Sequence, residues 1–274
     1  MVLVTPDTQM ARCPMMRAIM SLSGGMDSTA LLMNLLSRGY DVSCLSFEYG
    51  QKHRIEVERA KSNISYLKEN GFLVDHRVIN LESAMGNFAS SLTNPNEPVP
   101  EGHYESEQMK LTVVPNRNAI FSSILYGHAI SIAKTEDCDV VIALGVHSGD
   151  HEIYPDCRPE FYEALGMAFE IGNWGSERVS FLLPYLNENK ESILKDAMNS
   201  SSKLNLNFDI VFSNTITSYE PDVAGKSSGK TGSDIERILA FHSIGKRDPI
   251  EYTDDWETVL RNALEVQIEY GDRK

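Results

Sequence analysis

The chain of 274 residues is 42% hydrophobic and carries a formal net charge of −14. That apolar content is enough for one large domain, or for one domain with a smaller appendage. A surface so acidic repels nucleic acid unless basic residues gather locally, so we expect no nucleic-acid partner. No apolar run is long enough to span a bilayer, and no two of the four cysteines form a C-x-x-C pair. We therefore expect no membrane association and no zinc ribbon, and reduced thiols in a cytoplasm are the simplest interpretation of the cysteines.

Short apolar, β-rich runs alternate along the chain with helical patterns. After an arm at residues 1–17, we expect strands at 18–23, 42–47, 76–81, 140–144 and 179–183. We expect helices at 28–38, 53–70, 118–134, 159–172, 190–198, 235–244 and 254–270. This alternation predicts an α/β fold of the Rossmann-like type, with a parallel sheet and helices on both of its faces.

Two stretches break the alternation. Residues 82–112 contain several prolines and acids, and residues 213–233 are rich in Ser, Thr, Gly and Lys. Loops of this length are usually functional lids or disordered segments. We therefore divide the chain into the arm at 1–17, a main α/β domain at 18–200, and a small C-terminal subdomain at 201–274.

The most informative stretch is Ser23-Gly24-Gly25-Met26-Asp27-Ser28-Thr29, between the first expected strand and the first expected helix. A glycine-rich turn at that junction places backbone N–H groups and the positive end of a helix around a phosphate. The glycines let the main chain approach an anion closely, and the hydroxyl groups add donors. Asp27 can cap the helix or meet a metal ion. The alternative is a tight strand-to-helix turn with ordinary N-caps.

Two further segments, at 48–53 and 145–158, also follow expected strands. In parallel sheets of this type, ligands bind at the carboxyl ends of the strands, near the point where the strand order reverses. We therefore expect the three segments to share one pocket.

The glycine-rich stretch resembles the SGGxDS loop of the PP-loop ATP pyrophosphatases. More narrowly, the chain resembles the 7-cyano-7-deazaguanine synthases, or QueC family. Between residue 18 and about residue 250, the other matching segments come in the family's order: Phe47–His53, Ser90–Thr93, Val114–Asn118 and Tyr154–Phe161, the last preceded by Gly145-Val146 and Asp150. The resemblance implies an adenine-nucleotide α-hydrolase-like fold and an ATP-dependent C–N ligase that releases AMP and pyrophosphate.

The resemblance also implies a reaction that belongs to queuosine biosynthesis. The carboxylate of 7-carboxy-7-deazaguanine would attack the α-phosphate of ATP, and ammonia would displace AMP from the acyl-adenylate to give an amide. A second ATP-dependent round would dehydrate the amide to 7-cyano-7-deazaguanine. Because adenylation turns a poor electrophile into one with a good leaving group, the enzyme's task is positioning and charge stabilisation around the phosphates, with Mg²⁺ as the expected metal.

By the same resemblance, specific residues receive roles. The catalytic residues would be Lys190, Arg117 and Asp27. ATP would be bound by Ser23, Gly24, Gly25, Asp27, Ser28, Thr29, Phe47 and Gln51. The deazaguanine would be bound by Tyr49, His53, Ser91, Asp150, Tyr154, Asp156 and Arg158.

Plainer interpretations of three of these residues stay open. Lys190 is alternatively a solvated lysine at a helix start, and Arg117 a partner in a surface salt bridge. Asp156 either accepts hydrogen bonds from a guanine-like base or caps the helix that begins near Pro159. Asn116 stands where the family has a glycine before the arginine, and asparagine tolerates a left-handed backbone better than most residues.

The chain departs from the family at its metal site. Four residues stand where the family has zinc-binding cysteines: Ser218, Ser228, Thr231 and Asp234. Hydroxyl groups are poor zinc ligands and one aspartate cannot hold a structural site, so we expect ATP and Mg²⁺ but no zinc.

This divergence leaves two alternatives to ammonia ligation. One is conjugation of the activated deazaguanine to a protein amine, in an antiviral defence context of the CBASS type. The other is a catalytically degenerate nucleotide-binding scaffold. By analogy with the family, we expect a cytoplasmic homodimer.

Overall fold

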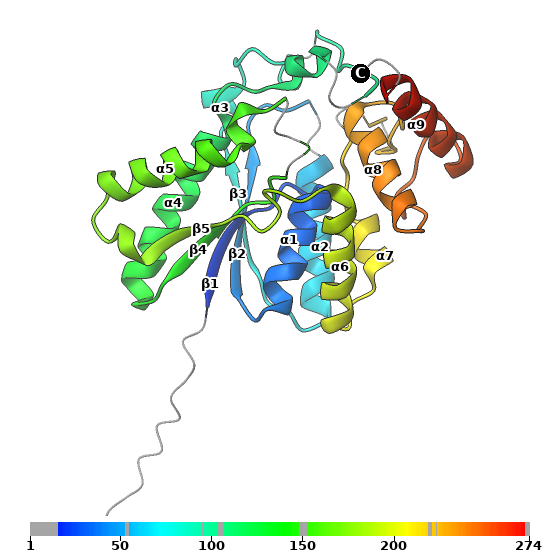
Figure 1. Cartoon of the computed structure of the whole chain (residues 1–274). Helices are drawn as coiled ribbons and strands as arrows, with labels where there is room; N and C mark the ends of the chain where they lie inside the picture. The colour runs from blue at the N-terminus through cyan, green and yellow to red at the C-terminus, as the bar shows by residue number, and fades with distance from the viewer. Residues whose placement is uncertain are drawn as a thin grey trace, which may run out of the picture.

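The computed structural model describes residues 16–52, 55–94, 96–103, 107–147, 149, 153–218, 221–222 and 224–271. The strands form one fully parallel sheet in the order β3-β2-β1-β4-β5 (Figure 1). Their bounds are β1 (Arg17–Ser21), β2 (Asp41–Glu48), β3 (Asp75–Asn80), β4 (Val140–Ala143) and β5 (Val179–Leu182). Every strand expected from the sequence is present, displaced at its ends by no more than about two residues.

Helices cover both faces of the sheet, which confirms the predicted fold class. The helices are α1 (Met26–Ser37), α2 (Ile55–Glu69), α3 (Glu82–Met85), α4 (Arg117–Glu136), α5 (Pro159–Gly172), α6 (Lys190–Lys203), α7 (Phe208–Ser213), α8 (Gly232–Ser243) and α9 (Trp256–Gly271). Figure 1 shows α4 and α5 on one side of the sheet and α1, α2 and α6 on the other. The short helices α3 and α7 were not expected from the sequence. Helix α6 also runs past residue 198, because its polar end is packed, with Ser200 and Ser201 buried.

The central strand β1 separates two hydrophobic cores. Ala18 and Met20 belong to the core beneath α1 and α6, and Ile19 belongs to the core beneath α4. Both faces of β1 are therefore buried, which explains why its sequence is a continuous apolar run instead of an alternating one.

The strand order places a reversal point beside β1. The chain runs from β1 outward through β2 to β3, then crosses back through α4 to β4 on the other side of β1. A sheet wound in both directions from its centre leaves a crevice outside the carboxyl ends of its two central strands. This is where the loop Ser23–Gly25 lies.

The segments that broke the alternation pack against this end of the sheet. In the described part of 82–112, Ser91 N donates to Leu111 O at 2.8 Å, and Lys52 N in the loop after β2 donates to Leu92 O at 3.0 Å. From the C-terminal part, Ile216 N donates to Gly24 O at 3.0 Å. Core residues on both sides of residue 200 share one cluster, including Phe212 and Phe241, so the domain division stays a proposal about chain organisation.

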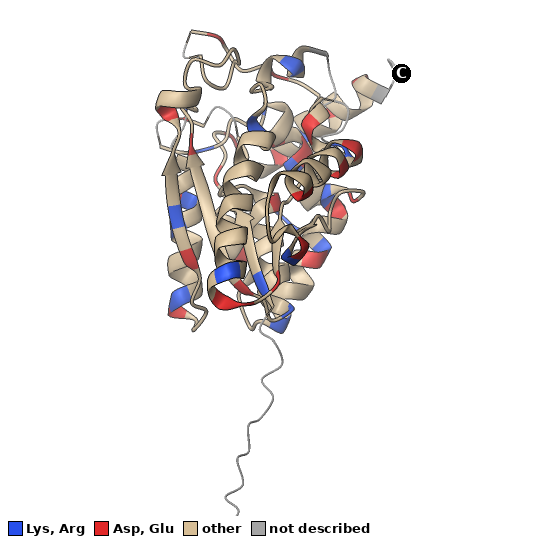
Figure 2. Ribbon diagram, turned by 90° about the vertical axis from the view of Figure 1, so that its left-hand side faces the viewer, with Lys and Arg blue, Asp and Glu red and all other residues tan. Residues whose placement is uncertain are grey.

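Charged residues of both signs are interspersed along the helices (Figure 2). Within the described residues, no helix combines the length and the apolar content that a bilayer span needs.

Candidate active site

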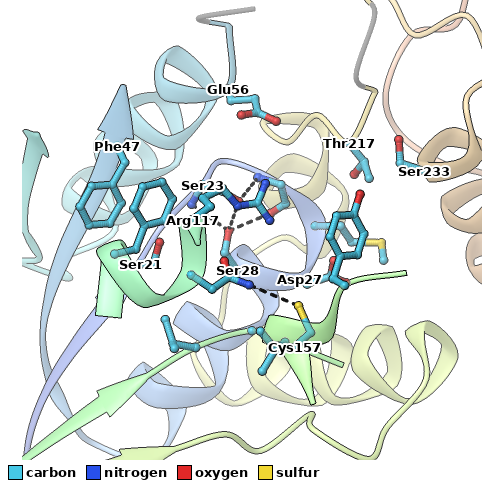
Figure 3. Close-up of a pocket in the computed structure, with 18 of the residues that line it drawn as sticks. Ser21, Ser23, Asp27, Ser28, Phe47, Glu56, Arg117, Cys157, Thr217 and Ser233 are labelled. Atoms are coloured by element: carbon cyan, nitrogen blue, oxygen red, sulfur yellow. Dashed lines mark hydrogen bonds between the residues drawn. The ribbon is translucent and has the colours of Figure 1, made fainter. Parts of the chain in front are cut away.

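A cavity of about 240 Å³ lies at the carboxyl end of the sheet. Residues at the carboxyl ends of β1, β2 and β4 line it, and they come from three segments: most of Ser23–Ser28, most of Phe47–Lys52, and all of Leu144–Val146. Arg117, Tyr154 and Lys190 complete the set of predicted site residues in its lining. Figure 3 shows Phe47 on one side of the pocket, with Thr217 and Ser233 on the opposite side. The structure therefore brings the three strand-end segments into one pocket, as the sequence predicts.

The loop Ser23–Gly25 is shaped by close contacts that only a glycine permits. Gly24 has a φ of +86°, and a Cβ atom there would lie 2.0 Å from the carbonyl oxygen of Glu56 at the start of α2. Ser23 Oγ accepts a hydrogen bond from Gly25 N at 3.1 Å and bonds Ser28 Oγ at 2.9 Å. Gly25 is the N-cap of α1 and has no side chain with which to satisfy the N–H groups of the first turn. The residues of this first turn, Met26, Asp27 and Ser28, line the cavity, and an uncapped helix start beside a cavity favours anion binding over an ordinary capped turn.

Lys190 reaches into the pocket from the first position of α6. Its Nζ lies 2.8 Å from Asp27 Oδ2 and 3.3 Å from Glu236 Oε2, and the residue is only 7% exposed. His147 Nε2 lies 3.9 Å from the same oxygen of Asp27. Burial alone would raise the pKa of Asp27, but the charges of Lys190 and His147 hold that pKa below its usual value. Lys190 is therefore not the solvated lysine of the alternative interpretation.

Arg117 is the first residue of α4 and follows a left-handed residue. Asn116 has φ 59° and ψ 16°, so the turn expected at this position is confirmed. The guanidinium carbon of Arg117 lies 5.9 Å from the centre of the Tyr154 ring. Burial raises the pKa of Tyr49, and the charge of Arg117 opposes that rise. Arg117 thus interacts with two buried tyrosines of the pocket, Tyr49 and Tyr154, instead of forming only a surface salt bridge.

Several lining residues were missed by sequence reasoning: Glu56, Asn118, Phe121, Thr217, Ser233 and Glu236. Phe121 stacks on Phe47 with ring centres 4.0 Å apart, and it lies one helical turn after Arg117, a spacing that could have revealed it. Burial raises the pKa of Glu56 to about 7, against the opposing charge of Arg117. Glu236 comes from α8, far along the chain, and no local pattern marks it.

Other predicted site residues do not line the cavity: Gly24, Thr29, Ser91, Asp156 and Arg158. His53 and Asp150 lie outside the described residues. Asp156 Oδ2 accepts a hydrogen bond from Asn118 N at 3.2 Å and so caps α4. The N-cap of α5 is Arg158, so the alternative in which Asp156 caps the helix near Pro159 is wrong. The substrate-binding role of Asp156 stays a prediction.

The four residues that the resemblance places at the family's cysteine positions meet in one cluster, which we call the Asp234 cluster: Ser218, Ser228, Thr231 and Asp234. Asp234 Oδ2 accepts hydrogen bonds from Ser218 Oγ at 3.2 Å, Ser228 Oγ at 3.3 Å and Thr231 N at 3.3 Å. Asp234 is 0% exposed, and burial raises its pKa although these donors oppose the rise. Among the described residues, no three His, Cys, Asp or Glu side chains are grouped as a metal site. Ser218, Ser233 and Glu236 also line the pocket, so this segment forms one of its walls.

Comparison with known proteins agrees with the motifs. The chain matches the family described as "Queuosine biosynthesis protein QueC" over residues 17–245. It is 43% identical over 236 residues to a 7-cyano-7-deazaguanine synthase of Marinomonas sp. (strain MWYL1), covering 86% of this chain and 98% of that protein. It is 38% identical over 237 residues to a 7-cyano-7-deazaguanine synthase of Methanoregula boonei, covering 86% of this chain and 99% of that protein. The chain therefore belongs to the QueC family.

Proposed function

We propose that this protein is an ATP-dependent C–N ligase that adenylates 7-carboxy-7-deazaguanine, forms the amide with ammonia and then dehydrates it to 7-cyano-7-deazaguanine. The observation that carries the proposal is the uncapped start of α1 in one pocket with Lys190 and Arg117. That combination suits a triphosphate, because both cations and helix N–H groups stabilise phosphate charge. The relatives named 7-cyano-7-deazaguanine synthase support the choice of substrate.

The pocket residues divide the work by their chemistry. Ser23, Ser28 and the first turn of α1 supply hydrogen-bond donors to the phosphates, and Lys190 supplies a compact positive charge. Arg117 supplies a planar fork of donors that matches the substrate carboxylate or the α-phosphate bidentately. With these groups fixed before the reaction, the negative charge that develops at the α-phosphate meets oriented donors without reorganisation.

One predicted ATP contact, Gln51, bonds the backbone of its own loop through both ends of its side-chain amide. The side-chain amide of Gln51 accepts from Tyr49 N at 2.8 Å and donates to Phe47 O at 3.1 Å. Gln51 therefore holds the shape of the loop after β2. Tyr49 and Tyr154 are buried and both interact with Arg117, and we propose that they hold the deazaguanine near that guanidinium.

The residues present fit Mg²⁺ carried by the triphosphate. Asp27 Oδ1 is buried and has no hydrogen-bond partner within the part of the chain that the structure describes. Mg²⁺ in nucleotide sites is commonly bound by one or two carboxylates together with phosphate oxygens. When bound, the ion would neutralise phosphate charge, and Asp27 would be its protein ligand.

The Asp234 cluster does not fit a structural zinc site. Its hydroxyl groups donate to Asp234, and hydroxyl oxygens are poor ligands for zinc. We propose that this segment keeps its fold by those hydrogen bonds and contains no zinc. The homodimer and the cytoplasmic location stay predictions.

The test combines the protein with ATP, Mg²⁺ and 7-carboxy-7-deazaguanine, with and without ammonium. Expected are pyrophosphate and AMP that depend on the deazaguanine, and a product with the mass of the nitrile only when ammonium is present. Pyrophosphate without any small-molecule product, but with deazaguanine mass added to a protein, would instead indicate a protein amine as acceptor. No substrate-dependent pyrophosphate at all would indicate the degenerate scaffold.

A further inference from the structure

The ammonium group of Lys190 lies between two carboxylates that come from opposite ends of the chain. Asp27, on α1, lies 2.8 Å from Nζ, and Glu236, on α8, lies 3.3 Å from it. Asp27 belongs to the phosphate-loop motif. Glu236 belongs to the wall formed by Ile216–Ser218 and Ser233–Glu236, which we call the C-terminal wall, and the proposed chemistry gives it no role.

The position of Glu236 is fixed by the residues on both sides of it. Asp234, two residues earlier, is the 0% exposed centre of the Asp234 cluster. Arg237, the next residue, is also 0% exposed and binds Asp248 through Nε at 2.6 Å and Nη2 at 2.9 Å. Arg237 Nη1 additionally donates to Thr215 Oγ1 at 2.8 Å. Glu236 therefore projects from a turn of α8 that is anchored on both sides, and a carboxylate on a rigid element can define a position closely.

A lysine with a single partner has much freedom around that partner. The side chain of Lys190 has four flexible methylene groups, and its ammonium accepts many directions of approach. With Asp27 alone, the ammonium could move around the carboxylate and away from the phosphate loop. A second carboxylate on the other side removes that freedom, and it also offsets the cost of burying the charge.

We propose that Glu236 is a positioning residue, which holds the Lys190 ammonium against Asp27 so that it is aimed at the phosphates before ATP binds. This inference rests on the proposed use of ATP. It assigns a reaction-related role to the C-terminal wall, which is anchored by the Asp234 cluster and by the ion pair of Arg237. Glu236 acts only through Lys190 and touches no reacting atom.

The first test is the isosteric change Glu236→Gln, with pyrophosphate release measured at varied ATP concentration. We expect kcat to fall about tenfold and KM for ATP to change by less than about threefold, since losing a negative charge near the phosphates offsets part of the lost order. Glu236→Asp, which keeps the charge, should recover to within about threefold of the wild-type kcat. The matched control is Glu191→Gln, which removes the same charge from the residue next to Lys190, where Glu191 pairs with exposed Lys195. The control should leave kcat unchanged.

The second test asks whether Glu236 acts through Lys190. In a Lys190→Arg background, the guanidinium has a different shape, and Glu236→Gln should lower the remaining kcat by less than about twofold. An unchanged kcat in Glu236→Gln, or failure of Glu236→Asp to recover, overturns the inference. The same tenfold loss in both backgrounds also overturns it, because the effect would then not involve Lys190. If the wild-type protein releases no pyrophosphate, the proposed function fails and the inference fails with it.

Discussion

The two walls of the pocket are held in place by different physical means. The wall formed by Ser23–Thr29, which we call the phosphate-loop wall, is shaped by backbone geometry, since Gly24 adopts a positive φ and packs directly against the main chain of Glu56. The wall formed by Ile216–Ser218 and Ser233–Glu236 is shaped by buried polar side chains, above all Asp234 and Arg237. The first wall is encoded in seven consecutive residues. The second is assembled from segments that meet only in the folded chain. We therefore expect mutations in the two walls to differ in their effects on stability and on pyrophosphate release.

The largest expected effect on stability is in the C-terminal wall. Asp248→Asn leaves the guanidinium of Arg237 charged, fully buried and without its carboxylate, although Thr215 and Thr217 still accept from it. We expect a loss of about 3–5 kcal/mol in the free energy of unfolding, measured by urea denaturation. The control is Asp209→Asn, which breaks the exposed pair of Asp209 with Lys246 and should cost less than about 1 kcal/mol. Equal effects of the two changes would show that the buried pair does not hold the wall.

The matching change in the phosphate-loop wall is Gly24→Ala. The new Cβ would meet the Glu56 carbonyl oxygen at 2.0 Å, so α2 or the loop must shift. We expect a loss of about 2–4 kcal/mol and a fall of about a hundredfold in pyrophosphate release. Gly39→Ala is the control, because Gly39 also has a positive φ of +81° but nothing within 4 Å of its Cβ position. It should cost about 1 kcal/mol, leaving the rate unchanged. If the two alanine variants lose the same stability, the close approach to Glu56 is not what requires glycine.

The contrast between the walls also explains what could be predicted from the sequence. The strands, the larger helices and the loop Ser23–Gly25 follow from periodicity and glycine placement, which are local properties. The αL turn at Asn116 was predictable from the family resemblance, which places a glycine before the arginine, and from the tolerance of asparagine for a left-handed backbone. Glu236 was not predictable, because its partner Lys190 lies on another helix and nothing in its neighbourhood marks it as a site residue.

Asp156 and helix α7 are two further features that local sequence patterns could not predict. Asp156 looks like a cap for the helix that follows it, but it bonds the start of α4, which precedes it by 38 residues. Helix α7 escaped prediction because six residues give too short a pattern, and it forms where Val211 and Phe212 are buried against α1 and α8. Tertiary packing determines both the partner of Asp156 and the formation of α7, and no local sequence pattern indicates either of them.

A smaller effect is expected at Glu56, which joins the phosphate-loop wall to Arg117. Because its pKa is about 7 in the folded protein against the usual 4.5, the folded state binds this proton more tightly than the unfolded chain does. The contribution of protonated Glu56 to the free energy of unfolding is therefore complete below about pH 4.5 and is lost as pH rises through about 7. Glu56→Gln should remove this dependence, so the variant should gain about 2 kcal/mol relative to wild type between pH 5 and pH 8. Urea denaturation at these two pH values measures it, and parallel pH profiles for the two proteins would contradict the assignment.

The smallest effect on stability is expected for Asp234→Asn. Comparing it with Asp248→Asn shows whether the two buried aspartates stabilise the protein by the same means. Unlike Asp248, Asp234 has no cation at hydrogen-bond distance among the described residues, and its bonds come from hydroxyl groups and one backbone N–H. An amide oxygen can accept all three of those bonds, so Asp234→Asn should cost about 1 kcal/mol or less near pH 7. Since burial raises the pKa of Asp234, wild-type stability should also fall relative to the variant as pH rises through that pKa. A loss as large as that of Asp248→Asn would mean that the cluster depends on the carboxylate charge, as a metal site would, and not on hydrogen bonds that a neutral acceptor can replace.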